Sequence, residues 1–185
     1  KHNVNMDQIT LGNGSNDVLV LLTEAFLSAN HNAVYSQYCF AVYPIAIQAI
    51  GAAHKQIPAK GWDSDSPLGH DLNAMLAAID DDTRLVFVAN PNNPTGNHLS
   101  EKELKGFIAQ IPEHVIVIVD EAYLEYSSIE EQVDASAWLN EFPNLVVTRT
   151  FSKAYGLAGL RVGYALSNPD IANVINRIRQ PFNVN

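Results

Sequence analysis

Residues 85–96 read Leu85-Val86-Phe87-Val88-Ala89-Asn90-Pro91-Asn92-Asn93-Pro94-Thr95-Gly96, a short apolar run followed by a turn rich in Asn and Pro. Two later segments have the same form: residues 115–119 precede Asp120, and residues 145–148 precede Thr150. Short, β-branched, apolar runs are typical of strands that helices cover on both faces. The three runs therefore predict the centre of a mostly parallel sheet.

Helix-like stretches alternate with these strand-like runs. Apolar residues at helical spacing predict a helix that follows Ser15-Asn16 and runs through Ala25-Phe26, and Asp71 is predicted to cap a helix that runs to Ala78. Further helices are expected at residues 42–52, 100–110, 135–141 and 169–178, and further strands at residues 33–35 and 54–58. The alternation predicts an α/β fold, a three-layer sandwich with helices on both faces of the sheet.

The composition limits the class of partner. The chain has 185 residues, with 11 Lys and Arg against 20 Asp and Glu, which gives a formal net charge of −9. Nucleic acid and anionic membrane surfaces repel such a charge, so neither is expected as the main partner. No apolar stretch is long enough to predict a transmembrane helix.

Residues 1–185 are expected to form one domain. The chain opens without an initiator Met and stops without a closing helix, so we expect a piece of a longer protein, cut at both ends. Its single cysteine, Cys39, cannot form an intrachain disulfide, which fits a reducing compartment and predicts a cytoplasmic location.

Polar side chains follow each of the three central strands. The first strand leads to Asn93, the second to Asp120 and Tyr123, and the third to Ser152 and Lys153. Ligands of open parallel sheets bind beyond the carboxyl ends of the strands. The sequence therefore predicts one crevice that contains an amide, a carboxylate, a phenol, a hydroxyl and an amine.

Asp120 and the cations beyond the third strand have two interpretations each. Asp120 follows an apolar strand, so desolvation opposes its charge, and its partner is either a cationic heterocycle or the turn that it caps. Lys153 is either a surface lysine or an amine nucleophile with a lowered pKa in a dry site beside a second cation. Arg161 suits a phosphate, although a surface salt bridge would also explain it.

Two features near the amino end leave similar alternatives. The glycine turn at residues 11–17 offers free backbone amides at a helix start, which is either a phosphate seat or a plain cap. It lacks the Walker A lysine and the third glycine of a dinucleotide fingerprint, which weakens a nicotinamide-oxidoreductase interpretation. Phe40 is either a ring that stacks on a flat cofactor or a core residue. The histidines and Cys39 have no metal-ligand spacing, so no metal site is expected.

Three segments together resemble the fold-type I pyridoxal-phosphate (PLP) aminotransferases. They are residues 90–96, residues 119–123, and residues 150–163, in which Arg161 follows Lys153 by eight positions. The resemblance covers essentially the whole chain and implies the major domain of a PLP-dependent transferase, without the small domain. Residues 12–17 and 179–185 most resemble the histidinol-phosphate aminotransferases.

The resemblance implies a role for each matching residue. Lys153 would hold PLP as a Schiff base and move the proton between the substrate and the cofactor, while Asp120 would keep the pyridine nitrogen protonated. Asn93 and Tyr123 would donate to the ring's phenolate oxygen, and Phe40 would stack on the ring. The phosphate would lie against Ser15, Asn16, Thr150, Ser152 and Arg161.

The same resemblance implies an enzyme that transfers an amino group between glutamate and an imidazole-acetol-phosphate-like ketone, in histidine biosynthesis. Its partners would be a small-molecule amino donor, a keto acceptor and a second copy in a homodimer. Aromatic aminotransferases and phospho-amino-acid decarboxylases share much of the pattern and stay open as alternatives. A fragment that binds PLP without catalysis is a further alternative.

Overall fold

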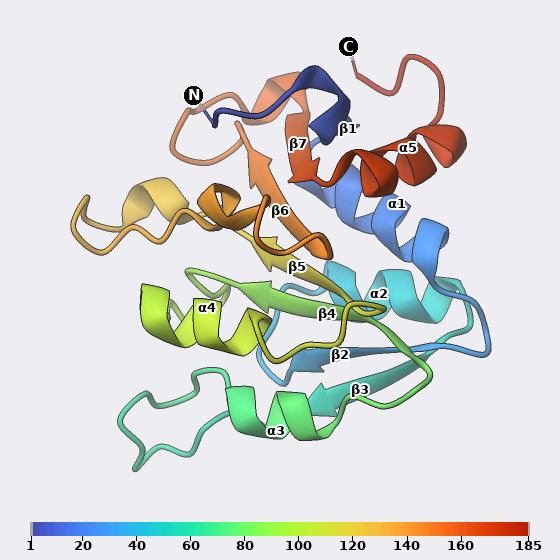
Figure 1. Ribbon diagram of the computed structural model, residues 1–185. Coiled ribbons are helices and arrows are strands. Elements are labelled where there is room, and N and C mark those ends of the chain that lie inside the picture. The colour runs from blue at the N-terminus through green and yellow to red at the C-terminus, as the bar shows by residue number, and fades with distance from the viewer. Residues whose placement is uncertain (1, 185) are drawn as a thin grey trace.

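In the computed structural model, which describes residues 2–184, seven strands form one sheet in the order β1-β7-β6-β5-β4-β2-β3 (Figure 1). The strands are β1 (Ile9–Asn13), β2 (Asn32–Ser36), β3 (Ala53–Ile57), β4 (Thr83–Ala89), β5 (Ile116–Asp120), β6 (Leu145–Thr150) and β7 (Val162–Ser167). The α-helices are α1 (Ser15–Phe26), α2 (Val42–Ala49), α3 (Leu72–Ala77), α4 (Glu101–Ile108) and α5 (Pro169–Ile178). Short 3-10 helices are η1 (Met6–Gln8), η2 (Leu124–Tyr126), η3 (Ala135–Trp138) and η4 (Ala158–Leu160).

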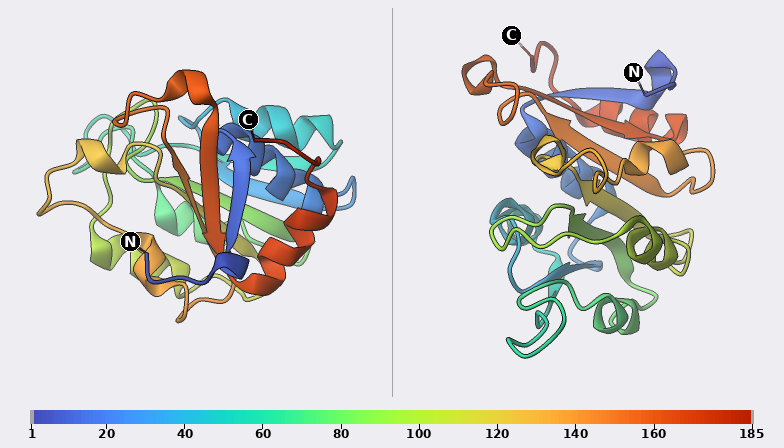
Figure 2. Two further views of the ribbon diagram at one scale, coloured as in Figure 1. Left: turned by 90° about the horizontal axis from the view of Figure 1, so that it is seen from above. Right: turned by 90° about the vertical axis from the view of Figure 1, so that its left-hand side faces the viewer.

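The predicted mostly parallel sheet is confirmed. β2 pairs in parallel with β3 and β4, and β4, β5 and β6 continue the parallel series. β7 is antiparallel to both of its neighbours, β6 and β1, so within residues 2–184 it alone runs against the other strands. The carboxyl ends of β2, β3, β4 and β5 point to the left in Figure 1, and this edge faces the viewer in the right-hand view of Figure 2.

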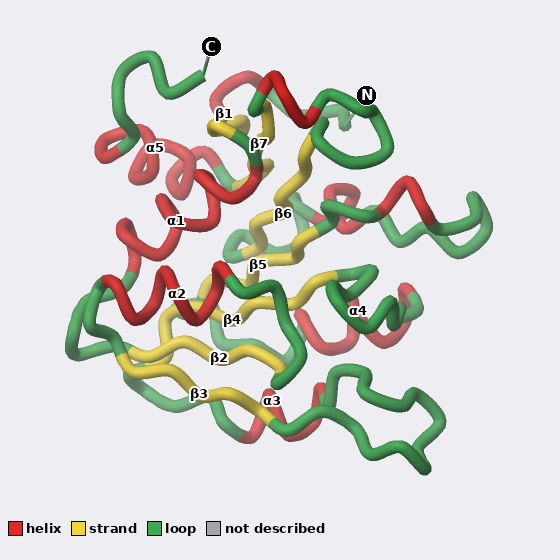
Figure 3. The backbone as a smooth tube through the Cα atoms, turned by 180° about the vertical axis from the view of Figure 1, so that it is seen from behind, coloured by secondary structure: helices red, strands yellow, loops and turns green. Residues whose placement is uncertain are grey.

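Two hydrophobic clusters lie on the two faces of the sheet, which confirms the three-layer arrangement. Alternate strand residues such as Val86 and Val117 pack with Leu104 and Phe107 of α4. The intervening residues pack against α1, α2 and α5. Figure 1 presents the face covered by α3 and α4, and Figure 3 presents the face covered by α1 and α2. Because both faces are covered, the strand residues at the centre are apolar on both sides.

Side-chain caps explain where two of the helices begin. Ser100 Oγ accepts a hydrogen bond from Glu103 N at 3.3 Å, and the Glu103 carboxylate accepts one from Ser100 N at 2.8 Å. This reciprocal pair satisfies two amides that the first turn of α4 leaves unpaired. Asp71 Oδ1 accepts from Ala74 N at 3.0 Å, so the predicted cap of α3 is confirmed. None of the helices within residues 2–184 has the length and apolarity needed to cross a bilayer.

The structure corrects two of the expected helices. Residues 135–141 do not form the expected crossover helix, and only the 3-10 helix η3 forms there. Asp134 accepts from Ser136 N at 3.0 Å and lies 2.8 Å from Arg149 Nη2, so the turn is held on β6 instead of continuing as an α-helix. α2 ends at Ala49 rather than at residue 52.

The strands β1 and β7 are additional to the prediction. Seen from above in the left-hand view of Figure 2, they lie side by side at one end of the sheet. Their pairing places the glycine turn that follows β1 opposite the start of β7, with Gly12 facing Gly163.

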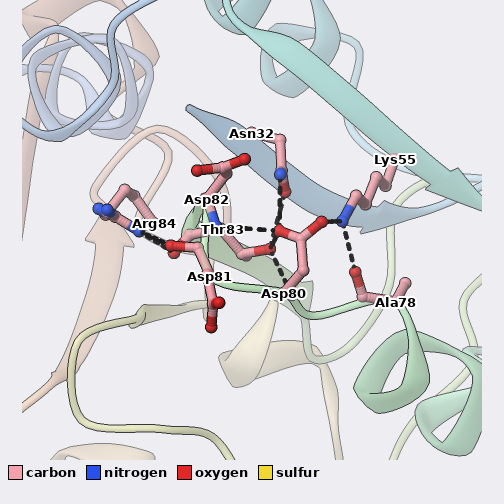
Figure 4. Close-up of polar contacts among 8 residues, drawn as sticks. All are labelled: Asn32, Lys55, Ala78, Asp80, Asp81, Asp82, Thr83 and Arg84. Carbon is pink, nitrogen blue, oxygen red and sulfur yellow. Dashed lines mark hydrogen bonds and ion pairs between the residues drawn. The ribbon is translucent and has the colours of Figure 1, made fainter. Parts of the chain in front are cut away.

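A polar cluster joins the amino ends of β2, β3 and β4 (Figure 4). Asp80 Oδ1 accepts hydrogen bonds from Asn32 Nδ2 at 2.9 Å and from Thr83 Oγ1 at 2.9 Å. The other carboxylate oxygen of Asp80 pairs with Lys55, whose Nζ also donates to Ala78 O at 2.8 Å. One carboxylate therefore connects three strands at the edge opposite the predicted crevice.

Candidate functional site

A cavity of about 50 Å³ lies at the carboxyl edge of the sheet. Six predicted site residues line it, together with Ala89, Pro91 and Ala122; they are Ser15, Phe40, Asn93, Asp120, Tyr123 and Lys153. They come from the start of α1, from the segments after β2 and β4, from the end of β5 and from the loop after β6. The parallel strands thus bring together side chains that are up to 138 positions apart, since 153 − 15 = 138.

Asp120 is buried at the end of β5, with only 5% of its surface exposed. Its Oδ2 accepts a hydrogen bond from the Tyr43 hydroxyl at 2.9 Å. Its Oδ1 accepts from Thr148 Oγ1 at 3.1 Å and from Ala122 N at 3.2 Å. Burial raises the pKa of Asp120, while these three donors and the charge of Lys153 act in the opposite direction. The carboxylate is therefore suited to a cationic partner that enters the cavity.

Lys153 lies in the loop between β6 and β7, in the same cavity as Asp120. Its Nζ is 5.3 Å from the centre of the Tyr123 ring, at a distance typical of a cation–π contact. Lys153 and residues 154–161 are exposed, so residues 2–184 by themselves do not supply the dry surrounding that one interpretation of Lys153 requires. No element within residues 2–184 covers this loop.

The start of α1 and the start of β7 form a crowded corner beside the cavity. A Cβ atom at Gly163 would lie 2.1 Å from Ser15 N, and one at Gly14 would lie 2.5 Å from Arg161 Nη2. Gly163 meets backbone atoms, so only glycine permits the close approach there, and Gly14 has a φ of +84°, a conformation that favours glycine. The first amides of α1 have no partner within the helix, so this corner can hold an anion between those amides and Arg161.

The remaining predicted residues lie around this corner and do not line the cavity. Arg161 Nη1 donates to Ala158 O at 3.0 Å and to Ser152 Oγ at 3.4 Å. Thr150 is buried, and its Oγ1 accepts from Ser152 N at 3.1 Å. Asn16 is exposed in the first turn of α1. Arg161, Ser152 and Thr150 therefore belong to one hydrogen-bonded group, at the place where the sequence predicted a phosphate.

The sequence places Tyr43 in an aromatic cluster with Tyr38 and Phe40, but it did not reveal that Tyr43 and Thr148 donate to Asp120. Thr148 is opposite Asp120 in the β5–β6 register, which a correct alignment of the two predicted strands would have revealed. Tyr43 comes from α2, 77 positions away in sequence, and the sequence carries no comparable signal for its contact with Asp120.

A second, larger cavity of about 590 Å³ shares Pro91, Asn93 and Tyr123 with the first. Polar groups such as His98, Ser127 and Glu131 also line it. A roomier cavity therefore lies next to the one that contains Asp120 and Lys153. Within residues 2–184, no three His, Cys, Asp or Glu side chains cluster in a way that could hold a metal ion.

Comparison with known proteins gives one family. A sequence model described as "Aminotransferase class I and II" matches residues 1–185. Histidinol-phosphate aminotransferase 2 of Methylococcus capsulatus is 62% identical over 96% of the chain and 48% of its own length. Histidinol-phosphate aminotransferase 1 of Mannheimia succiniciproducens is 54% identical over 100% of the chain and 49% of its own length. The chain thus spans about half the length of these relatives.

A solved structure has the same fold. Histidinol-phosphate aminotransferase from Sinorhizobium meliloti, in complex with pyridoxal 5′-phosphate, superimposes with a TM-score of 0.85 at 31% identity. The match covers 94% of the chain and 46% of that protein.

Proposed function

The chain belongs to the aminotransferase class I and II family, and on that premise we propose that the complete protein is a PLP-dependent aminotransferase. Residues 1–185 would be its cofactor-binding large domain. One observation carries the proposal: Lys153 and Asp120 line a single cavity, together with Asn93 and Tyr123. An amine and a desolvated carboxylate in one site are what a flat, cationic heterocycle with a reactive carbonyl requires.

The donor set fits PLP at each polar position of the cofactor. Asp120 suits the ring nitrogen, because burial makes its carboxylate favour a cationic partner. Asn93 and Tyr123 would donate to the ring hydroxyl oxygen, and Phe40 would cover one face of the ring. The phosphate would lie at the glycine-lined corner, against the first amides of α1 and Arg161.

The bound cofactor supplies an electron sink next to the substrate α-carbon, and the protein supplies position and charge. Asp120 Oδ2 would hold a proton on the ring nitrogen. Lys153 Nζ would first attach the cofactor and then, once displaced, take the proton from the substrate α-carbon and deliver it to the C4′ carbon of the cofactor. The position of Lys153 beside the Tyr123 ring supports this role, since Tyr123 limits where the amine can move.

The proposed substrates are histidinol phosphate and 2-oxoglutarate, or imidazole-acetol phosphate and glutamate in the reverse direction, in histidine biosynthesis. The relatives that are 62% and 54% identical have this activity in their names. The larger cavity next to Asn93 and Tyr123 offers space for a substrate side chain.

A homodimer and a cytoplasmic location are also part of the proposal. Leu157 and Leu160, in the loop after Lys153, are 43% and 57% exposed. Apolar side chains exposed beside a site favour contact with another protein surface, here a second copy.

Borohydride trapping tests the proposal in the complete protein. Reduction in the presence of PLP should fix the cofactor on Lys153, as peptide mass spectrometry would detect. The Lys153→Ala variant should lose the label, and Lys102→Ala, which changes an exposed lysine of α4, should keep it. A label on another lysine would overturn the site.

A product assay tests the reaction. Histidinol phosphate and 2-oxoglutarate should give glutamate in amounts that depend on both substrates. Release of CO₂ without glutamate would identify a decarboxylase, and turnover restricted to aromatic amino acids would identify an aromatic aminotransferase. PLP attachment without any turnover would leave a binding function alone.

A further inference from the structure

The two oxygens of the Asp120 carboxylate have different hydrogen-bond partners. Oδ1 accepts from two donors, Thr148 Oγ1 and Ala122 N, whereas among residues 2–184 the Tyr43 hydroxyl alone donates to Oδ2. A carboxylate oxygen has two lone pairs. Oδ1 is thus saturated within the protein, and Oδ2 has one acceptor position left.

Tyr43 is held in place on several sides. Only 1% of its surface is exposed, and its ring stacks on Phe87 of β4 with centroids 4.6 Å apart and planes 18° apart. Phe40 meets the same ring edge to face, at 6.0 Å and 89°. The hydroxyl therefore has little freedom to leave Asp120.

The Tyr43 hydroxyl stays a donor across the working pH range. Burial raises the pKa of Tyr43 well above its usual value, and the neighbouring Asp120 carboxylate raises it further. A phenol that cannot ionise beside a carboxylate can only donate to it. Loss of this donor would raise the pKa of Asp120 further and so favour its protonated form, which cannot pair with a protonated ring nitrogen.

We propose that Tyr43 is a positioning residue that keeps Asp120 ionised and turns the free lone pair of Oδ2 toward the ring nitrogen of the cofactor. This inference rests on the proposed function, because it assumes that PLP occupies the cavity. Tyr43 also backs Phe40, so one side chain supports both the charge partner and the ring that covers the cofactor.

The test compares two cofactors on two proteins. Tyr43→Phe removes one buried oxygen atom and keeps the ring. It should weaken PLP binding about tenfold or more, the usual size for a hydrogen bond to a charged group. Binding of the PLP analogue in which C–H replaces the ring nitrogen should change much less, because that analogue has no nitrogen for Asp120 to meet.

The matched control is Tyr35→Phe. Tyr35 is another buried tyrosine on the same face of the sheet, and its hydroxyl bonds to His54 Nδ1 at 2.7 Å, away from the cavity. Both cofactors should bind this variant as they bind the unaltered protein. Equal losses for PLP and its analogue in Tyr43→Phe would mean a merely structural role and would overturn the inference.

Two further results separate the possible failures. If the unaltered protein does not bind PLP, the proposed function fails, and the inference fails with it. If the unaltered protein binds PLP and Tyr43→Phe binds it equally well, only the inference fails. If Tyr43→Phe does not fold, the same change is made in an Asp120→Asn background. If this double variant binds PLP more weakly than Asp120→Asn alone, Tyr43 does not act through Asp120, and the inference is overturned.

Discussion

Asp120 and Asp80 lie at opposite edges of the sheet, and each accepts several hydrogen bonds. The donors to Asp120 come from helix α2, strand β6 and the loop after β5. The side chains that donate to Asp80 come from β2, β3 and β4. The pKa of Asp120 is raised, with burial as the largest cause, and that of Asp80 is lowered, with the hydrogen bond from Lys55 as the largest cause. Asp120 is buried, whereas the Asp80 side chain is 52% exposed. The number of hydrogen-bond donors alone therefore does not decide the direction in which the pKa of a carboxylate shifts. Asp120 is buried without a bound cation, which suits it to a cationic ligand. Asp80 is exposed and paired with Lys55, so it connects strands and has a structural role.

The largest effect is expected from a substitution of Asp120, the aspartate that is suited to a ligand. Asp120→Asn should lower aminotransferase activity on the order of 100-fold or more, because a buried charge pair loses one partner. The cofactor-free protein should be at least as stable as the unaltered one, since a desolvated carboxylate is removed. Activity assays and thermal unfolding without PLP would check the two parts, and unchanged activity would contradict the role of Asp120.

Glu121 combines the two conditions, because it is buried like Asp120 and paired with a cation like Asp80. Arg149 Nε donates to Glu121 Oε2 at 2.8 Å, and Ala135 N donates to Oε1 at 2.7 Å. Burial raises the pKa of Glu121, and Arg149 counteracts that effect. Glu121→Gln leaves the buried Arg149 with only the more exposed Asp134 as an acidic partner.

We expect Glu121→Gln to lower the free energy of unfolding by about 3–5 kcal/mol, the usual loss when one partner of a buried pair is removed. Denaturant titration measures the change. Glu113→Gln, at an exposed loop position, is the control and should have almost no effect. A loss no larger than that of the control would mean that the pair contributes nothing to stability.

Asp80→Asn should have a smaller effect, confined to stability. The amide keeps one acceptor oxygen but loses the charge that pairs with Lys55, so the thermal midpoint should fall by a few degrees. Asp81→Asn, at the next and exposed position, should leave the midpoint unchanged. PLP binding should be normal in both variants, and weakened binding in Asp80→Asn would show that the two edges are coupled.

The pH dependence of stability gives the finest test of the comparison. The depressed pKa of Asp80 means that its contribution is present above the unfolded value of about 3.9 and is lost as the pH falls through the folded pKa. The raised pKa of Asp120 means that its protonated form favours folding below that value, and this contribution is lost as the pH rises through the folded pKa.

Unfolding free energies of the cofactor-free protein, measured against pH for each Asp→Asn variant and the unaltered protein, should therefore differ in slope. For each site, the difference is the unfolding free energy of the unaltered protein minus that of the Asp→Asn variant. For Asp80 this difference should rise with pH in the acid range, and for Asp120 it should fall. Curves with the same sign of slope would contradict the contrast between the two edges.

Much of the fold could be predicted from the sequence, because burial on both faces leaves a strong mark on central strands. β4, β5 and β6 are continuous apolar runs, and each is present in the structure. β1 and β7 carry no such mark, because Gly12 and Gly163 interrupt their apolar residues. Those glycines permit close contact with the start of α1. The same glycines interrupt the apolar pattern by which β1 and β7 could have been predicted.

The site could be predicted where residues follow strands and not where helices supply them. Asp120, Lys153 and Asn93 come directly after predicted strands, so the parallel topology alone brings them together. Tyr43 reaches Asp120 from a helix, through packing that depends on the angle at which α2 crosses the sheet. Sequence spacing does not encode that angle, and the tyrosine therefore resembles an ordinary core residue.

The reversed direction of β7 has a consequence for how the molecule tolerates change. Because β6 ends and β7 begins at the same edge, one loop carries both Lys153 and Arg161, and its length sets the span between the amine and the guanidinium. An insertion between Lys153 and Arg161 would change the distance between the amine and the guanidinium. An insertion of equal size in the exposed segment at residues 61–67 would leave that distance unchanged. Designers who wish to graft a reporter onto this scaffold should choose the second place and leave the first at its natural length.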